Sequence, residues 1–224
     1  MKTKKFITII TLLILCVVFS VNINALMIAN ESEGAYLTPP PAPNGTATIR
    51  SITIRQLIVA GGSHFLKSAG YINQFFNLVE SSELTAPDYR GLQKSLNAAI
   101  SYMQQAKYNY LQLKNLASET PYNQEVIYRL LNFDYDSFQE ENGLFPVIFK
   151  KVKGFLATGN VTGIYNEFYS YTERILDLLY TFKKDIDSEI FPDLSSLWNV
   201  NQKYSEVKLF GQYVAMVFYS INHK

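Results

Sequence analysis

The sequence predicts an all-α protein, an elongated antiparallel bundle of about five helical segments. Apolar residues recur at alternating intervals of four and three along three long stretches, residues 86–117, 161–187 and 194–222. This spacing keeps one helix face against a neighbour over its whole length. Intervals that follow the period of a strand are absent, and Pro or Gly stands between the segments. The short connections favour antiparallel neighbours.

The first segment, residues 48–81, has a less regular stripe because glycines interrupt it. Gly61, Gly62 and Gly70 lie in its middle, and each costs about 1 kcal/mol relative to alanine in a helix interior. Close approach of a neighbouring helix would offset that cost, and a kink beside a ligand cavity is the alternative. The expected stripe is Ile54, Ile58, Gly61, Phe65, Ile72, Phe76 and Val79.

The second segment, residues 86–117, has start signals and the most regular stripe. Thr85 is the expected cap, with Pro87 in the first turn and Asp88 returning a bond to the amide of the cap. The expected core face is Leu92, Leu96, Ala99, Met103, Ala106, Tyr110, Leu113 and Ala117.

The third segment opens at Thr120-Pro121 and is broken near Gly143, with Pro146 close behind. A short amphipathic piece follows and ends at Gly159-Asn160. Pro192 then separates the last two long helices. Their expected stripes are Ile164, Phe168, Tyr171, Ile175, Leu178 and Phe182 in the first, and Leu197, Val200, Tyr204, Val207, Gly211, Val214, Phe218 and Ile221 in the second.

The first 25 residues read as a secretory signal peptide. Three lysines precede an apolar run from Phe6 to Val21, and Ala25 offers a cleavage site. We therefore expect a periplasmic or extracellular protein that meets the membrane only transiently through this segment. An uncleaved segment that tethers the protein to the membrane is the alternative. The single cysteine, Cys16, lies inside the apolar run, so no thiol remains after cleavage.

Residues 26–47 read as a Pro-rich, disordered linker because Pro39 to Pro43 cannot continue a helix or a central strand. Residues 48–224 then form a single helical-bundle domain. Removing the three signal lysines leaves 17 basic residues against 19 acidic ones. A chain with such balanced charge lacks the net positive potential that attracts the phosphates of nucleic acid, so we expect no nucleic-acid partner.

Motifs for catalysis and metal binding are missing, so we expect no enzyme, no catalytic residue, no metal and no cofactor. The chain has no HExxH motif and no Glu-x-x-His pair. Asn132, Asp134 and Asp136 begin like a calcium loop, but Ser137 and Gly143 occupy two of its defining positions. His64 and Met216, near the edges of the first and last stripes, are the residue types of axial haem ligands, but a single histidine near an apolar stripe is more often a hydrogen-bonded residue at the edge of the core.

Aromatic residues, 14% of the chain, are the one compositional excess. Tyrosine suits interfaces because its ring packs while its hydroxyl stays solvated. We therefore expect a non-enzymatic exported protein that contacts a protein partner or another copy of itself through aromatic helix faces, with His64, Tyr102 and Tyr169 as residues that contact the partner or a ligand. The alternative is a small apolar ligand or a non-covalent cofactor in a cavity near Gly61–Gly70. The tyrosines outside the stripes are Tyr71, Tyr89, Tyr102, Tyr108, Tyr128, Tyr165, Tyr169 and Tyr180.

Overall fold

The computed structural model describes residues 46–82, 87–118 and 123–223. All regular structure in these ranges is helical and no strand occurs in them, which confirms the all-α class. The helices are α2 (Thr46–Ser82), α3 (Tyr89–Ser118), α4 (Gln124–Leu131), α5 (Tyr135–Asn142), α6 (Pro146–Leu156), α7 (Val161–Asp187) and α8 (Leu194–His223).

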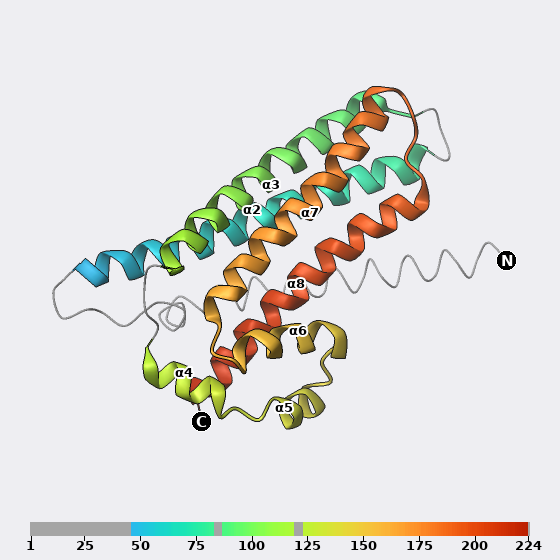
Figure 1. The fold of residues 1–224 in the computed structure, drawn as a ribbon. Helices are drawn as coiled ribbons and strands as arrows, with labels where there is room; N and C mark the ends of the chain where they lie inside the picture. The colour runs from blue at the N-terminus through green and yellow to red at the C-terminus, as the bar shows by residue number, and fades with distance from the viewer. Residues whose placement is uncertain (1–45, 83–86, 119–122, 224) are drawn as a thin grey trace. The chain divides into compact units, whose positions relative to one another are not determined.

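The long helices α2 and α3 pack antiparallel, and α7 packs antiparallel against α3 (Figure 1). Contacts along the first pair show the register: Leu78 of α2 lies near Gly91 of α3, and Gly61 lies near Tyr110. The residue numbers fall on one helix as they rise on the other. The helix α8 runs back beside α7 (Figure 1). The three predicted long helices after residue 86 therefore all belong to the bundle.

The core face predicted for α3 is confirmed. All eight residues of its stripe are buried, from Leu92 to Ala117, together with Ser95 and Ile100. The stripe of α2 shifts by one residue: Phe75 is fully buried and stacks on Phe182 of α7 at 5.8 Å between ring centroids, while Phe76 is only half-buried. The buried residue after Ile72 is therefore three positions further on, at Phe75, and not four positions further on, at Phe76.

The third predicted segment is three short helices, α4, α5 and α6. The predicted break at Gly143 is present, where φ of 58° places the residue in the left-handed region that glycine tolerates. A second break, at residues 132–134, was not expected. The Asp134 side chain accepts a hydrogen bond from the Ser137 amide at 3.1 Å and starts α5 as its N-cap. Such local bonding of a short acidic side chain competes with helix continuation.

The second segment also begins later than expected. Asp88, not Thr85, caps α3 at Tyr89, because its carboxylate accepts a hydrogen bond from the Gly91 amide at 2.9 Å. At α4 the cap is Asn123, whose side chain accepts from the Glu125 amide at 2.9 Å. Thr85 and Thr120-Pro121 lie outside the described residues.

The predicted signal peptide, residues 1–25, and most of the predicted linker, residues 26–47, also lie outside the described residues. Thr46 and Ala47, assigned to the linker, are the first two residues of α2. Among the described helices, none combines the length and the apolar character that a membrane span requires.

Candidate functional site

His64 and Tyr102, two of the three predicted contact residues, lie together between α2 and α3. Their ring centroids are 6.2 Å apart, and the His64 imidazole Nδ1 lies 3.1 Å from the side-chain amide nitrogen of Asn109. Both aromatic residues are half-buried. The antiparallel register explains the meeting, because His64 and Tyr102 occupy the edges of the two core stripes that face each other.

Two more residues of α2 complete this group. The ring of Tyr71 stacks on Tyr102 with centroids 5.6 Å apart and planes 11° apart. The Lys67 ammonium lies 5.4 Å from the centroid of the Tyr102 ring, close enough for a cation–π contact. We call His64, Lys67, Tyr71, Tyr102 and Asn109 the cation–tyrosine strip. It presents positive charge beside half-exposed aromatic rings.

Tyr169, the third predicted contact residue, lies in a separate cluster between α7 and α3. Its ring lies between two lysines of α3, with Lys107 and Lys114 at 5.4 and 5.2 Å from the centroid. Its hydroxyl donates to Glu173 at 2.9 Å, and Lys107 pairs with the same carboxylate at 2.9 Å. The structure therefore makes Tyr169 part of a clamp that joins α3 to α7.

The electrostatics of the clamp follow from these bonds. The hydrogen bond from Lys107, followed by that from Tyr169, lowers the pKa of the Glu173 carboxyl. The hydrogen bond to Glu173 raises the pKa of Lys107. Both groups are therefore charged throughout the neutral pH range.

An open groove of about 660 Å³ runs between α3 and α7 beside the clamp. Three of its residues expose large side chains: Tyr108 (62% exposed), Tyr180 (45%) and Leu111 (37%). The Tyr180 hydroxyl accepts a hydrogen bond from the Gln104 side chain at 2.6 Å, which fixes one ring across the two helices. The full lining is Gln104, Lys107, Tyr108, Leu111, Ser170, Glu173, Arg174, Leu176, Asp177 and Tyr180.

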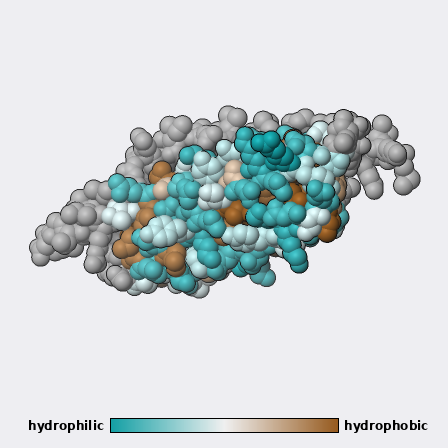
Figure 2. All heavy atoms as spheres, turned by 90° about the horizontal axis from the view of Figure 1, so that it is seen from above, coloured by the Kyte–Doolittle hydropathy of each residue, from teal (hydrophilic) through white to brown (hydrophobic). Residues whose placement is uncertain are grey.

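This groove is distinguished by its shape, because its exposed apolar side chains lie together along one concave surface formed by two helices. Figure 2 shows one face of the molecule, on which hydrophilic residues predominate and hydrophobic ones appear as separate patches. Scattered exposure of this kind is normal for a folded protein. Two tyrosines and a leucine along one concave, two-helix surface are a more specific arrangement.

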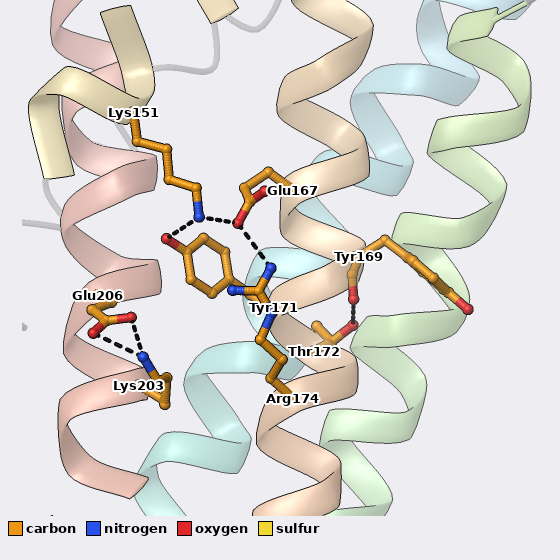
Figure 3. A network of polar contacts seen from close by, with 8 residues as sticks. All are labelled: Lys151, Glu167, Tyr169, Tyr171, Thr172, Arg174, Lys203 and Glu206. Carbon is orange, nitrogen blue, oxygen red and sulfur yellow. Dashed lines mark hydrogen bonds and ion pairs between the residues drawn. The ribbon is translucent and has the colours of Figure 1, made fainter. Parts of the chain in front are cut away.

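A network of charged groups joins α6 to α7. Figure 3 shows the Lys151 ammonium between the Glu167 carboxylate and the Tyr171 hydroxyl, with Tyr169 extending the other way, toward α3. Arg174 approaches Glu167 at 3.5 Å and lies over the Tyr171 ring at 5.3 Å.

Burial is the largest single effect on the pKa of Lys151 and lowers it, but the hydrogen bonds and charge interactions with Glu167 and Tyr171 together outweigh burial, so the pKa is raised. Burial raises the pKa of Tyr171, against the opposing effect of Lys151. Because its bonds connect Lys151 of α6 with Glu167 and Tyr171 of α7, we assign the network to fastening α6 on α7.

The glycine-rich part of α2 packs tightly at one point. A Cβ atom at Gly61 would lie 2.8 Å from the Tyr110 ring of α3, whereas one at Gly70 would meet nothing within 4 Å. Close approach of a neighbouring helix therefore accounts for Gly61. The space beside it is filled by an aromatic ring and does not form a ligand cavity at that position.

Two residues of the groove, Tyr108 and Tyr180, were among the tyrosines outside the predicted stripes but were not chosen as contacts. Their exposed positions follow from being about 180° from the core stripe on the helical wheel, a signal the sequence contained. Tyr165, from the same set, is buried at 1% exposure. No family model, curated protein or solved structure matches this chain.

Proposed function

We propose that this protein is an exported, non-enzymatic helical protein that binds a helix of a partner protein in the groove between α3 and α7. The observation that carries the proposal is the exposure of Tyr108, Tyr180 and Leu111 along one open groove on two packed helices. Tyrosine contributes a large contact area and loses little conformational entropy on binding, and it is enriched at protein interfaces.

The geometry of the groove suits a helix. Two antiparallel helices provide a straight, rigid channel, and an amphipathic helix lays its apolar face into such a channel. The groove is open to solvent and is lined by both helices, so a partner helix can be laid against its walls. The clamp of Lys107, Glu173 and Tyr169 holds the two walls together at a fixed spacing.

The charged residues of the groove walls indicate which charges the partner helix would carry. Arg174 and Asp177 are both exposed on α7 and line the groove. A partner helix with an apolar ridge and both acidic and basic residues beside it would match this pattern. Charged residues at the rim contribute mainly to orientation and specificity, while Tyr108, Leu111 and Tyr180 would provide most of the affinity.

Export is the part of the proposal that rests on the N-terminal sequence. The positive start, the apolar run and Ala25 support secretion to a periplasmic or extracellular location. Retention of residues 1–25 would instead leave the bundle tethered to a membrane. Cleavage can be read directly from the N-terminal residue of the exported protein.

The proposal is tested by placing a photo-crosslinking amino acid at position 108 and expressing the protein in its natural host. The control carries the same group at Tyr128, which is as exposed (67%) but lies on α4, away from the groove. We expect one defined adduct from position 108 that is absent from position 128. Equal adducts at both positions, or none at 108, would contradict the proposal.

A further inference from the structure

The charges of this chain are segregated, although their sum is nearly zero. Residues 46–79 and 89–118, which cover nearly all of α2 and α3, contain no Asp or Glu. Residues 130–149, which contain α5, have no Lys or Arg but four acidic residues. The basic residues of the first group are Arg50, Arg55, Lys67, Arg90, Lys94, Lys107 and Lys114, and the acidic residues of the second are Asp134, Asp136, Glu140 and Glu141.

The basic side includes the cation–tyrosine strip. Lys67 is exposed there and lies over the Tyr102 ring, which is stacked on Tyr71. Lys94 is also exposed and precedes Tyr102 by two i,i+4 steps on α3. Eight residues of helix place Lys94 about 12 Å from Tyr102 toward the start of α3 and about 80° round the helix, so Lys94 adds positive charge beside the strip on the more exposed side of α3.

The acidic side combines charge with exposed apolar groups. Glu140 and Glu141 are exposed at the end of α5. Just beyond them, Phe145 and Val147 are 59% and 81% exposed. The Phe145 backbone is held in place, because its amide donates to the Tyr213 hydroxyl at 3.0 Å. The segment therefore presents two carboxylates next to an aromatic and an aliphatic side chain on a fixed backbone.

We propose that copies of this protein associate head to tail, with the acidic segment around Glu140, Glu141 and Phe145 of one copy docked on the cation–tyrosine strip of the next. The two surfaces are complementary in charge, and each offers aromatic or apolar contact area beside its charges. Carboxylates would meet Lys67 and Lys94, while Phe145 would pack on the tyrosine pair.

The two surfaces lie on different elements, so the contact is heterologous. Such contacts produce closed rings or open chains of copies, depending on the rotation between neighbours. The strip faces outward between α2 and α3, whereas the groove of the proposed partner helix lies between α3 and α7. Self-association is therefore independent of the proposed function and leaves the groove open.

Charge-swap variants test this inference. Lys67→Glu/Lys94→Glu makes both surfaces acidic, and Glu140→Lys/Glu141→Lys makes both basic. We expect the purified wild type to show a mass that rises with concentration in sedimentation velocity. Each variant alone should associate at least tenfold more weakly, and an equal mixture of the two should regain association, because opposite charges meet again.

Salt and two matched variants complete the experiment. Raising NaCl from about 0.1 M to about 1 M shortens the Debye length from ~10 Å to ~3 Å and should weaken wild-type association. Lys184→Glu, a reversal at an exposed lysine of α7, and Tyr108→Ala/Tyr180→Ala should both associate like the wild type. Circular dichroism and the melting temperature establish that each variant is folded.

A wild type that stays monomeric at every concentration would overturn the inference. So would folded charge variants that associate like the wild type, or a mixture that remains monomeric. Loss of association in Tyr108→Ala/Tyr180→Ala alone would assign the contact to the groove and equally reject the head-to-tail arrangement.

Discussion

The Tyr204 hydroxyl of α8 lies 2.6 Å from the Ser68 hydroxyl of α2, within the core. Ser68 already donates its one hydroxyl proton to the Ala99 carbonyl of α3 at 2.7 Å, so Tyr204 is the donor to Ser68. Burial raises the pKa of Tyr204, so it keeps that proton. Two hydrogen bonds thus fix three helices relative to one another.

This order of donors predicts unequal effects of two substitutions. Tyr204→Phe removes the donor but leaves Ser68 bonded to Ala99, and should cost about 1 kcal/mol of unfolding free energy. Ser68→Ala leaves the buried Tyr204 hydroxyl without its acceptor and should cost more, about 1–3 kcal/mol. Urea unfolding of the two variants measures the order. A larger loss from Tyr204→Phe would contradict the donor assignment.

A pair of glycines on α2 provides a second comparison. Gly61→Ala would place a Cβ atom 2.8 Å from the Tyr110 ring, so the strain of overpacking, about 1–3 kcal/mol, should exceed the gain in helix propensity. Gly70→Ala meets nothing within 4 Å and should raise stability by up to ~1 kcal/mol. Thermal unfolding would show opposite shifts, and shifts of the same sign would reject the packing role of Gly61.

Tyr169 of α7 and Tyr108 of α3 should differ in how much they contribute to stability. Tyr169→Ala removes a ring that lies against Lys107 and Lys114 and a bond to Glu173, so it should lower stability by about 1–2 kcal/mol. Tyr108→Ala removes an exposed ring and should change stability by less than about 0.5 kcal/mol. Chemical denaturation measures both. Equal losses would mean that Tyr108 is part of the scaffold.

The Lys107–Glu173 pair should make the free energy of unfolding depend on pH in the acidic range. The pKa of Glu173 is lowered in the folded protein, so its contribution is present above its ordinary pKa of 4.5 and is lost as the pH falls through the lower folded value. Because both side chains are partly exposed, solvent screening keeps the contribution near ~0.5 kcal/mol.

The measurement is the difference in unfolding free energy between the wild type and Glu173→Gln. It should be constant near neutral pH and shrink toward zero below about pH 4. The control variant is Asp187→Asn, which removes the carboxylate of the exposed i,i+4 pair Lys183–Asp187 and is measured in the same way. A difference for Glu173→Gln that does not change with pH would mean that the substitution acts through packing alone.

The long helices were predictable because each core face repeats over many turns. On α3, eight stripe residues from Leu92 to Ala117 leave only one way to bury a continuous face, and all eight are buried. On α2, the choice between Phe75 and Phe76 depended on the neighbouring helix. The stacking of Phe75 on Phe182 decides it, and no local pattern contains that contact.

The short helices were harder to predict because side-chain bonding decides their ends. Asp134 could continue a helix or cap a new one, and the bond to the Ser137 amide makes it a cap. The break at Gly143 was predictable because its left-handed conformation favours glycine.

None of the three predicted contact residues lines the groove. His64 and Tyr102 do lie together, but Tyr169 is engaged in the clamp, and the exposed groove depends on which tyrosines the packing leaves uncovered. The segregation of charge was visible in the sequence all along. Net charge concealed it, because the acidic segment and acidic residues elsewhere in the chain offset the basic residues of α2 and α3 when the whole chain is summed.

The most direct measurement of the proposed function is the affinity of the partner that crosslinks at position 108. Isothermal titration would compare the wild type with Tyr108→Ala/Tyr180→Ala, and with Tyr128→Ala as the control. We expect the double variant to bind at least tenfold more weakly, with its melting temperature unchanged and the control unaffected. Equal affinity of the double variant and the wild type would contradict binding in the α3–α7 groove.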